Sequence, residues 1–199
     1  MTLHLFSTGR IAGRFSTHWQ PIWVLAIDHP EGVFLVDTGI TTRTRHLLFK
    51  FKITRDEEID RQLAGATPKA IILTHLHFDH VGGLYHFPHT PVIHPKPKDY
   101  NDTCGPFTKA LYLTENLVLV HTPGHTRDHC SVLIKTGTEH ILFAGDVAET
   151  QQKLENPTIK AYADHHPLIV LLTHDPESNI RLATLQPLPS SKTGNQKHR

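Results

Sequence analysis

The side chains best suited to chemistry are concentrated at residues 74–83, which read Thr-His-Leu-His-Phe-Asp-His-Val-Gly-Gly. Three imidazoles and a carboxylate fall within six positions, directly after an apolar stretch. Crowding these groups is unfavourable unless a cation organises them, and imidazole and carboxylate are preferred ligands of zinc and similar divalent ions. The segment therefore predicts a metal site. Its candidate ligands are His75, His77, Asp79 and His80.

Candidate ligands recur wherever a predicted strand stops. Binding groups gather at strand ends because the sheet fixes their positions while the loops stay free to vary. In an extended segment, residues 75, 77 and 79 would face the same way while His80 points elsewhere. The segment could thus serve two neighbouring cations, and each half-site would need distant partners. The candidates that follow other strands are Asp37, His125, Asp146 and His174.

Composition limits the kind of protein. The 199 residues are enough for one domain with a core, and 38% hydrophobic with 20% charged residues is an ordinary balance. A net charge of +1 without a basic stripe predicts no nucleic-acid partner. No window approaches the ~18 apolar residues of a membrane span. The first residues lack the order of a signal peptide, so we expect no membrane contact and a cytoplasmic location.

Cysteine and histidine usage adds two expectations. Cys104 and Cys130 are too few and too far apart for a zinc knuckle or a disulfide framework, and we expect two reduced thiols. Histidine is abundant, with 18 residues spread along the chain. Most of those outside the candidate site are expected to be solvated, and one of them could contact the substrate at the rim of the site. They include His86, His89, His129, His165 and His166.

Apolar patterns predict a chain of mixed strands and helices. The predicted strands are residues 2–8, 22–28, 33–37, 70–73, 91–94, two within 110–122, 130–135, 140–144 and 168–172. Helices are predicted at residues 55–64 and 176–185, the second capped by Asp175, and a further helix is expected to begin within 81–86. The stretch at 148–164 has a helix-friendly composition that Pro157 interrupts. We assign no helix or strand to residues 40–54. The polar composition of the tail from Pro187 onward predicts disorder.

Five segments together resemble the metallo-β-lactamase superfamily, and they occur in that family's order. They are Leu35–Gly39, Thr74–Gly83, Thr122–Thr126, Phe143–Asp146 and Thr173–Asp175. The resemblance implies an α/β fold, the four-layer αββα metallo-β-lactamase sandwich, with metals at one edge. It implies a single metallo-β-lactamase-like domain over residues 1–186, followed by a disordered tail at 187–199.

The resemblance also implies the metal ligands. The first ion would be held by His75, His77 and His125, and the second by Asp79, His80 and His174. Asp146 would bridge both ions, and Asp37 would support the metal loop through hydrogen bonds without being a ligand. Two divalent ions are expected as cofactors, with zinc first and manganese, iron or cobalt as alternatives.

Two such ions ~3.5–4 Å apart can share a hydroxide that attacks a carbonyl, with Asp79 as the candidate to relay a proton. The expected function is a dinuclear metal-dependent hydrolase of a small ester, lactone or thioester, acting through a metal-bridging hydroxide. The partner is a small-molecule substrate, and the sequence leaves the oligomeric state open. The loops at residues 10–20, 40–54 and 98–110 are expected to wall the pocket.

Within the superfamily, residues 72–80 and 173–177 look most like the N-acyl homoserine lactonase group. Those lactonases carry a tyrosine three residues after the bridging aspartate, and Glu149 stands at this position here. Two interpretations of Glu149 stay open. It could stabilise a helix N-terminus, or it could act in catalysis as a proton shuttle or substrate contact. The stretch from Asp146 to His174 also looks short for that group.

Two alternative functions stay open. A glyoxalase II-like thioesterase would carry an added helical domain, and the chain extends only about 25 residues past His174, which disfavours it. A non-hydrolytic iron-binding redox or sensor member is the other alternative. Flavin-linked diiron members carry Glu in place of the second histidine of the motif, so His77 argues against it. A β-lactamase and a ribonuclease Z-like nuclease are disfavoured by the expected lack of export and by the charge balance.

Overall fold

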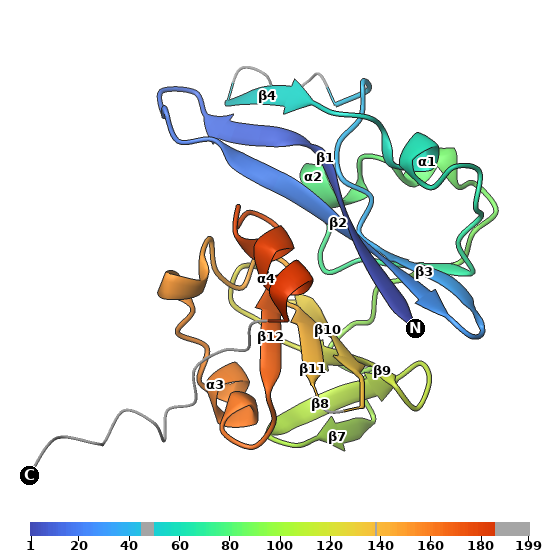
Figure 1. Cartoon of the computed structure of the whole chain (residues 1–199), viewed down its shortest axis with the longest axis vertical. Helices are drawn as coiled ribbons and strands as arrows, with labels where there is room; N and C mark the ends of the chain where they lie inside the picture. Colours follow the sequence, from blue (N-terminus) through green and yellow to red (C-terminus); the bar gives the residue numbers. More distant parts are fainter. Residues whose placement is uncertain (45–49, 138, 186–199) are drawn as a thin grey trace, which may run out of the picture. The chain divides into compact units, whose positions relative to one another are not determined.

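The computed structural model describes residues 1–44, 50–137 and 139–185 (Figure 1). The chain divides into two compact units, Met1–His94 and Pro95–Arg199. Each unit contains one six-stranded sheet. The tail at 187–199 lies outside the described residues, and the single domain over residues 1–186 stays a prediction.

The sheet of the first unit has the strand order β4-β1-β2-β3-β5-β6. β1, β2 and β3 form an antiparallel meander, whereas β3, β5 and β6 run parallel to one another. Carboxyl ends of parallel strands meet at one edge of a sheet, so the segments that follow β3 and β5 come together there. The bounds are β1 Thr2–Gly13, β2 Gln20–His29, β3 Gly32–Val36, β4 Phe51–Arg55, β5 Ala70–Ile72 and β6 Val92–Ile93.

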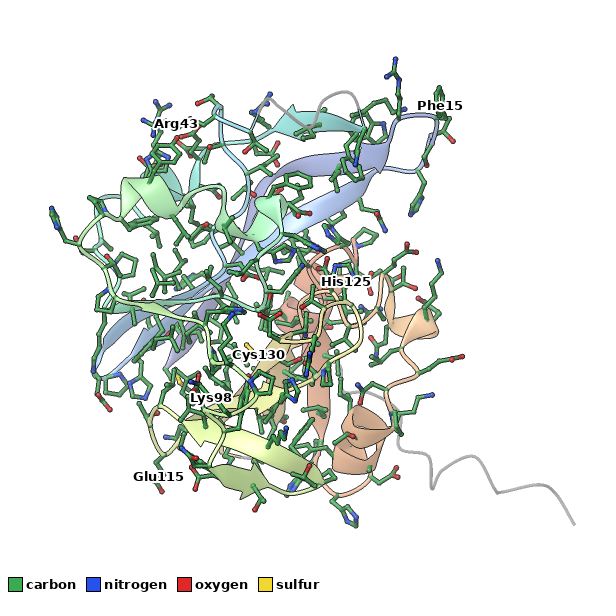
Figure 2. All side chains as sticks on the ribbon, turned by 180° about the vertical axis from the view of Figure 1, so that it is seen from behind. Phe15, Arg43, Lys98, Glu115, His125 and Cys130 are labelled. Carbon is green, nitrogen blue, oxygen red and sulfur yellow. The ribbon has the colours of Figure 1, made fainter. Side chains whose placement is uncertain are left out.

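Most strands of this unit agree with prediction, but two boundaries were wrong. β1 continues to Gly13 because its second half pairs with β4, where Gly13 lies opposite Phe51. Arg55, predicted to begin a helix, is therefore the last residue of β4, and α1 covers only Ile59–Gln62. In Figure 2, Phe15 marks the tip that joins β1 to β2.

The histidine-rich segment is not extended throughout. α2 spans Phe78–Val81, and His77 before it is the last extended residue, with φ −73° and ψ 155°. The prediction that residues 75, 77 and 79 face one way in an extended segment is therefore wrong for Asp79. Asp79 lies in the first turn of a helix, where a carboxylate is favourable. A 3₁₀ turn at Leu84–His86 follows.

One face of the first sheet is covered by these short helices. Ile59 of α1 and Val81 of α2 pack in a cluster with Val24, Leu35 and Ile71 of the strands. Ile59, Val24, Leu35 and Ile71 are fully buried. Removing this apolar surface from water stabilises the base on which the histidine-rich segment is built.

The sheet of the second unit has the order β12-β11-β10-β9-β8-β7. β11 and β12 pair in parallel, and the other pairs are antiparallel. The strands predicted within 110–122 and at 130–135, 140–144 and 168–172 are confirmed. The predicted wall loop at 98–110 instead contains β7 and the start of β8. The bounds are β7 Asp102–Cys104, β8 Phe107–Tyr112, β9 Leu117–His121, β10 Cys130–Lys135, β11 His140–Phe143 and β12 Leu168–Leu171.

The helices of the second unit are short. Pro157 begins α3 (Pro157–Ala163) rather than interrupting a helix, because it occupies the first turn and the Asn156 side chain caps the amides of Thr158 and Ile159. A 3₁₀ turn lies at Gln151–Lys153. Helix α4 covers Ser178–Thr184 and lies near β12 in Figure 1. Among the described helices, none combines the length and hydropathy of a membrane crossing.

Candidate functional site

Asp37 organises the strand edge of the first unit. It follows β3 and is fully buried, with the left-handed φ of 62° that non-glycine residues adopt only at a cost. Its carboxylate accepts hydrogen bonds from the Thr74 amide at 2.8 Å and the Thr74 hydroxyl at 2.9 Å. Nδ1 of His80 lies 2.7 Å from the same carboxylate. These donors offset the cost of burying the charge.

The contact with Asp37 determines which nitrogen of His80 carries hydrogen. A carboxylate accepts, so Nδ1 donates and Nε2 keeps its lone pair on the other side of the ring. Nε2 of His80 lies 4.0 Å from Oδ1 of Asp79. A carboxylate on the far nitrogen is the usual support for a histidine that binds a metal ion.

The other imidazoles of the segment crowd around the same point. The ring centroid of His75 lies 4.5 Å from that of His77 and 4.0 Å from that of His80. His75, His80 and Asp79 are buried, while His77 is exposed. The first unit thus brings all four predicted ligands of the segment together, and three imidazoles with a carboxylate fit a divalent metal ion.

In the second unit, strand topology gathers residues distant in sequence. β9, β11 and β12 end at the edge where β10 begins, because β10 is antiparallel to β9 and β11. Pairing continues past β11 and β12, since the Ala144 amide donates to the Leu171 carbonyl and the Thr173 amide donates to the Gly145 carbonyl. The residues that follow, Asp146 and His174, are thereby adjacent.

Asp146 lies between two imidazoles. Its Oδ2 is 3.3 Å from Nε2 of His174 and 3.5 Å from Nε2 of His125. The side chains of Asp146 and His174 are 9% and 12% exposed, and that of His125, labelled in Figure 2, is 36% exposed. One carboxylate oxygen facing two imidazole nitrogens is a donor set that suits a divalent ion.

His129 is a site residue that the sequence interpretation missed. It belongs to the histidines of which most were expected to be solvated, but it is fully buried. Its Nε2 accepts the amide hydrogen of Asp146 at 3.2 Å, so Nδ1 carries the ring hydrogen and donates to the Thr122 hydroxyl at 3.0 Å. Thr122 in turn lies 2.7 Å from the Ser131 hydroxyl. His129 therefore positions the backbone of Asp146, and its place just before a buried strand was the available signal.

The remaining candidates have other surroundings. Glu149 is exposed and forms an ion pair with Lys153, four residues later, so both interpretations of Glu149 stay predictions. Asp175 is buried but is not the N-cap of α4, which is Glu177. The Asp175 carboxylate instead accepts the amides of Gln151 and Glu177 and pairs with Arg181 at 2.6 Å.

Sequence comparison identifies related hydrolases. The sequence model of the metallo-β-lactamase superfamily matches residues 19–99. An N-acyl homoserine lactonase from a Bacillus species is 30% identical over 168 residues, covering 68% of this chain and 67% of that one. A hydroxyacylglutathione hydrolase from Erwinia tasmaniensis is 37% identical over 86 residues, covering 40% of this chain and 33% of that one.

Structure comparison gives a consistent result. A quorum-quenching N-acyl homoserine lactone lactonase superposes with a TM-score of 0.70 at 22% sequence identity. The match covers 94% of this chain and 96% of that one. This likeness concerns the fold, and it confirms the fold class that was predicted from the sequence.

Proposed function

The chain belongs to the metallo-β-lactamase superfamily and is a metallo-hydrolase, and we propose that it hydrolyses a small lactone, ester or thioester with two divalent metal ions. The observation that carries this proposal is the paired arrangement of donors. One strand edge of the first unit presents His75, His77, Asp79 and His80, and one strand edge of the second unit presents His125, Asp146 and His174.

In this proposal the two edges contribute to one shared centre. His75, His77 and His125 would hold one ion, Asp79, His80 and His174 would hold the other, and Asp146 would bridge them. Support comes from the position of the Asp146 carboxylate oxygen, which lies 3.5 Å or less from one imidazole of each proposed set. A carboxylate placed between two histidine ligands is what a bridging role requires.

When bound, the ions would supply an activated water and polarise the carbonyl of the substrate. The protein's own residues would orient and protect this chemistry. Asp37 holds Nδ1 of His80, which keeps the ring at a fixed angle. His129 holds the Asp146 backbone. The buried carboxylate of Asp79, next to His80, is the proposed acceptor for the proton that must leave the attacking water.

We propose a lactone as the leading substrate class, because the N-acyl homoserine lactonase is similar over both units of this chain. Glu149 would replace the tyrosine of that group. Its exposed carboxylate pairs with Lys153, so it could act on substrate only at the rim. If the Glu149→Gln variant has an unchanged pH–rate profile, Glu149 does not shuttle a proton and serves only in its ion pair with Lys153.

A thioester is the second candidate substrate. It is favoured by the hydroxyacylglutathione hydrolase, which matches 40% of the chain at 37% identity. Both substrates have a carbonyl that the same centre could activate, and they differ in the leaving group. A thiolate leaves more readily than an alkoxide. Turnover of a thioester is therefore compared with turnover of a lactone, and the ratio of the two distinguishes the candidate substrates.

The test is a panel of acyl homoserine lactones, aryl esters and acyl thioesters, offered to metal-loaded and metal-free protein. We expect metal-dependent turnover, highest with lactones, that is lost in Asp146→Asn. The matched control is Asp102→Asn, which removes an exposed carboxylate on β7. This variant should keep full activity. Turnover by metal-free protein, or by Asp146→Asn at the wild-type rate, would refute the proposal. A single bound iron with oxygen consumption would favour the redox alternative.

A further inference from the structure

A second cluster of metal-binding side chains lies in the first unit, outside the 74–83 segment. It consists of Glu58, Asp60 and His86, whose ligand atoms lie within 4.8 Å of one another. Glu58 and Asp60 stand at the start of α1, and His86 ends the 3₁₀ turn after α2. Asp60 and His86 also line a cavity of about 360 Å³, together with His89.

Glu58 determines which ring nitrogen of His86 carries the hydrogen. The Thr42 amide donates to Oε1 of Glu58 at 2.7 Å, and the Tyr85 hydroxyl donates to Oε2 at 3.1 Å. Both oxygens of Glu58 therefore accept hydrogen bonds, as those of a carboxylate do. Its Oε2 lies 2.7 Å from Nε2 of His86, so Nε2 carries the hydrogen.

This arrangement leaves two acceptors facing each other. With the hydrogen on Nε2, a neutral His86 presents the lone pair of Nδ1 to Oδ2 of Asp60 at 3.3 Å. Oδ1 of Asp60 is shielded from solvent and accepts no hydrogen bond within the described part of the chain. The nearby Arg43 guanidinium (labelled in Figure 2) instead stacks 3.7 Å above the ring of Tyr85. A cation between Nδ1 and the carboxylate would satisfy both groups.

We propose that Nδ1 of His86 and the carboxylate of Asp60 bind a divalent transition-metal ion of the zinc type, and that Glu58 supports His86 from the other side of its ring. Carboxylate, histidine and metal in this order recur in protein metal sites, because the carboxylate fixes the tautomer and raises the basicity of the ligand. One nitrogen with carboxylate oxygen favours Zn²⁺, Ni²⁺ or Cu²⁺ over Mg²⁺ or Ca²⁺.

The cavity beside this pair can complete the coordination. A volume of about 360 Å³ holds several water molecules, since one water occupies about 30 Å³ of liquid. His89 lines the same space and is exposed. The competing arrangement is a doubly protonated His86 that forms ion pairs with both carboxylates and has no affinity for a metal ion.

The experiment counts the ions bound by the 199-residue chain after its proposed active centre has been loaded with metal. Equilibrium dialysis against Zn²⁺, followed by metal analysis, should show one additional ion per chain. That ion should be absent in Asp60→Asn and His86→Gln, and present in His18→Gln, which replaces an exposed histidine elsewhere in the same unit. Hydrolytic turnover should not change in these variants, which separates this site from the proposed active centre.

Glu58→Gln provides a sharper comparison, because both ligand side chains remain. The glutamine amide can donate to Nε2, which shifts the hydrogen to Nδ1 and removes the lone pair that the ion needs. We expect the affinity for the additional ion to fall by about 10–100-fold. Equal affinity in wild type and Glu58→Gln would contradict the assigned tautomer and the proposal with it.

One measurement needs no variant. Crystals of the wild-type protein soaked in Zn²⁺ should give an anomalous scattering peak about 2.0–2.2 Å from Nδ1 of His86 and from a carboxylate oxygen of Asp60. No peak there, or equal ion counts in wild type and Asp60→Asn, would overturn the proposal and favour the doubly protonated His86.

Discussion

At the scale of single residues, the negative charge of Asp37 is the feature on which the first strand edge depends. The carboxylate is fully buried and accepts hydrogen from both Thr74 and His80. These contacts orient one predicted ligand and the start of the segment that carries the others. A residue that touches no substrate can therefore control the affinity of the centre for metal.

Asp37→Asn tests this role without changing the backbone. Asparagine tolerates the left-handed conformation of residue 37 and has nearly the same shape, so the substitution removes the charge and replaces one acceptor oxygen with an amide donor. We expect metal affinity, measured by competition with a chelator, to fall by about 10–100-fold, with turnover falling at limiting metal. Asp28→Asn, an exposed carboxylate paired with His4, should leave both unchanged. Wild-type affinity in Asp37→Asn would contradict the account.

The low pKa of Glu58 predicts a loss of stability in acid. The folded value is about 2 and the ordinary value is 4.5, so between these pH values the unfolded chain binds a proton that the folded chain does not. The stability that Glu58 provides is present above pH 4.5 and is lost as the pH falls toward 2. In urea unfolding of metal-stripped protein, Glu58→Gln should reduce this pH dependence by on the order of 2 kcal/mol. If the free energy of unfolding depends on pH in the same way in wild type and in Glu58→Gln, the low pKa of Glu58 is contradicted.

At the scale of elements, hydrogen bonds hold the turn after β3 against α2. The amide and hydroxyl of Thr38 donate to the His80 carbonyl at 2.7 and 2.9 Å, and the Gly83 amide donates to the Thr38 hydroxyl at 3.1 Å. This close approach depends on glycine, because a Cβ at residue 83 would lie 2.6 Å from the Thr38 carbonyl oxygen. The turn and the helix are thereby held as one support for the ligands.

Gly83→Ala should therefore strain this contact. Added methyl groups in close-packed regions typically cost about 1–3 kcal/mol, which we expect as a lower free energy of unfolding in urea. Metal affinity should fall with it, because α2 carries Asp79 and His80. The control is Gly137→Ala, where a Cβ meets nothing within 4 Å. If the two variants are equally stable, the close contact between Thr38 and Gly83 does not constrain α2.

The elements differ in how far the sequence predicts them. Buried strands such as β5 and β12 were predicted because their apolar runs are local signals. β4 was missed because it depends on pairing with the far end of β1. A helix was expected to begin at Val81, but α2 already ends there, and its four residues are too few to show a helical period. Pro157 was interpreted as a break, although the Asn156 cap makes it the start of α3.

At the scale of the whole molecule, the order of the motifs predicts the superfamily and its fold better than any single element does. The fold is shared with a lactonase at only 22% sequence identity. The position of His129 before a buried strand indicated that it could be buried, but its hydrogen bond with the Asp146 amide arises only when β10 begins beside the end of β11. The loops that are expected to wall the substrate pocket carry no comparable pattern.

The central claim is that two metal ions bound by the seven predicted ligands perform the hydrolysis. The most direct measurement is a zinc titration of metal-free protein during lactone hydrolysis, in the Asp60→Asn background so that the proposed additional site does not contribute. We expect no turnover without metal and a plateau in turnover when two ions per chain are bound, with no comparable activity in Asp146→Asn. Full turnover in metal-free protein, or a plateau at one ion per chain, would contradict this claim.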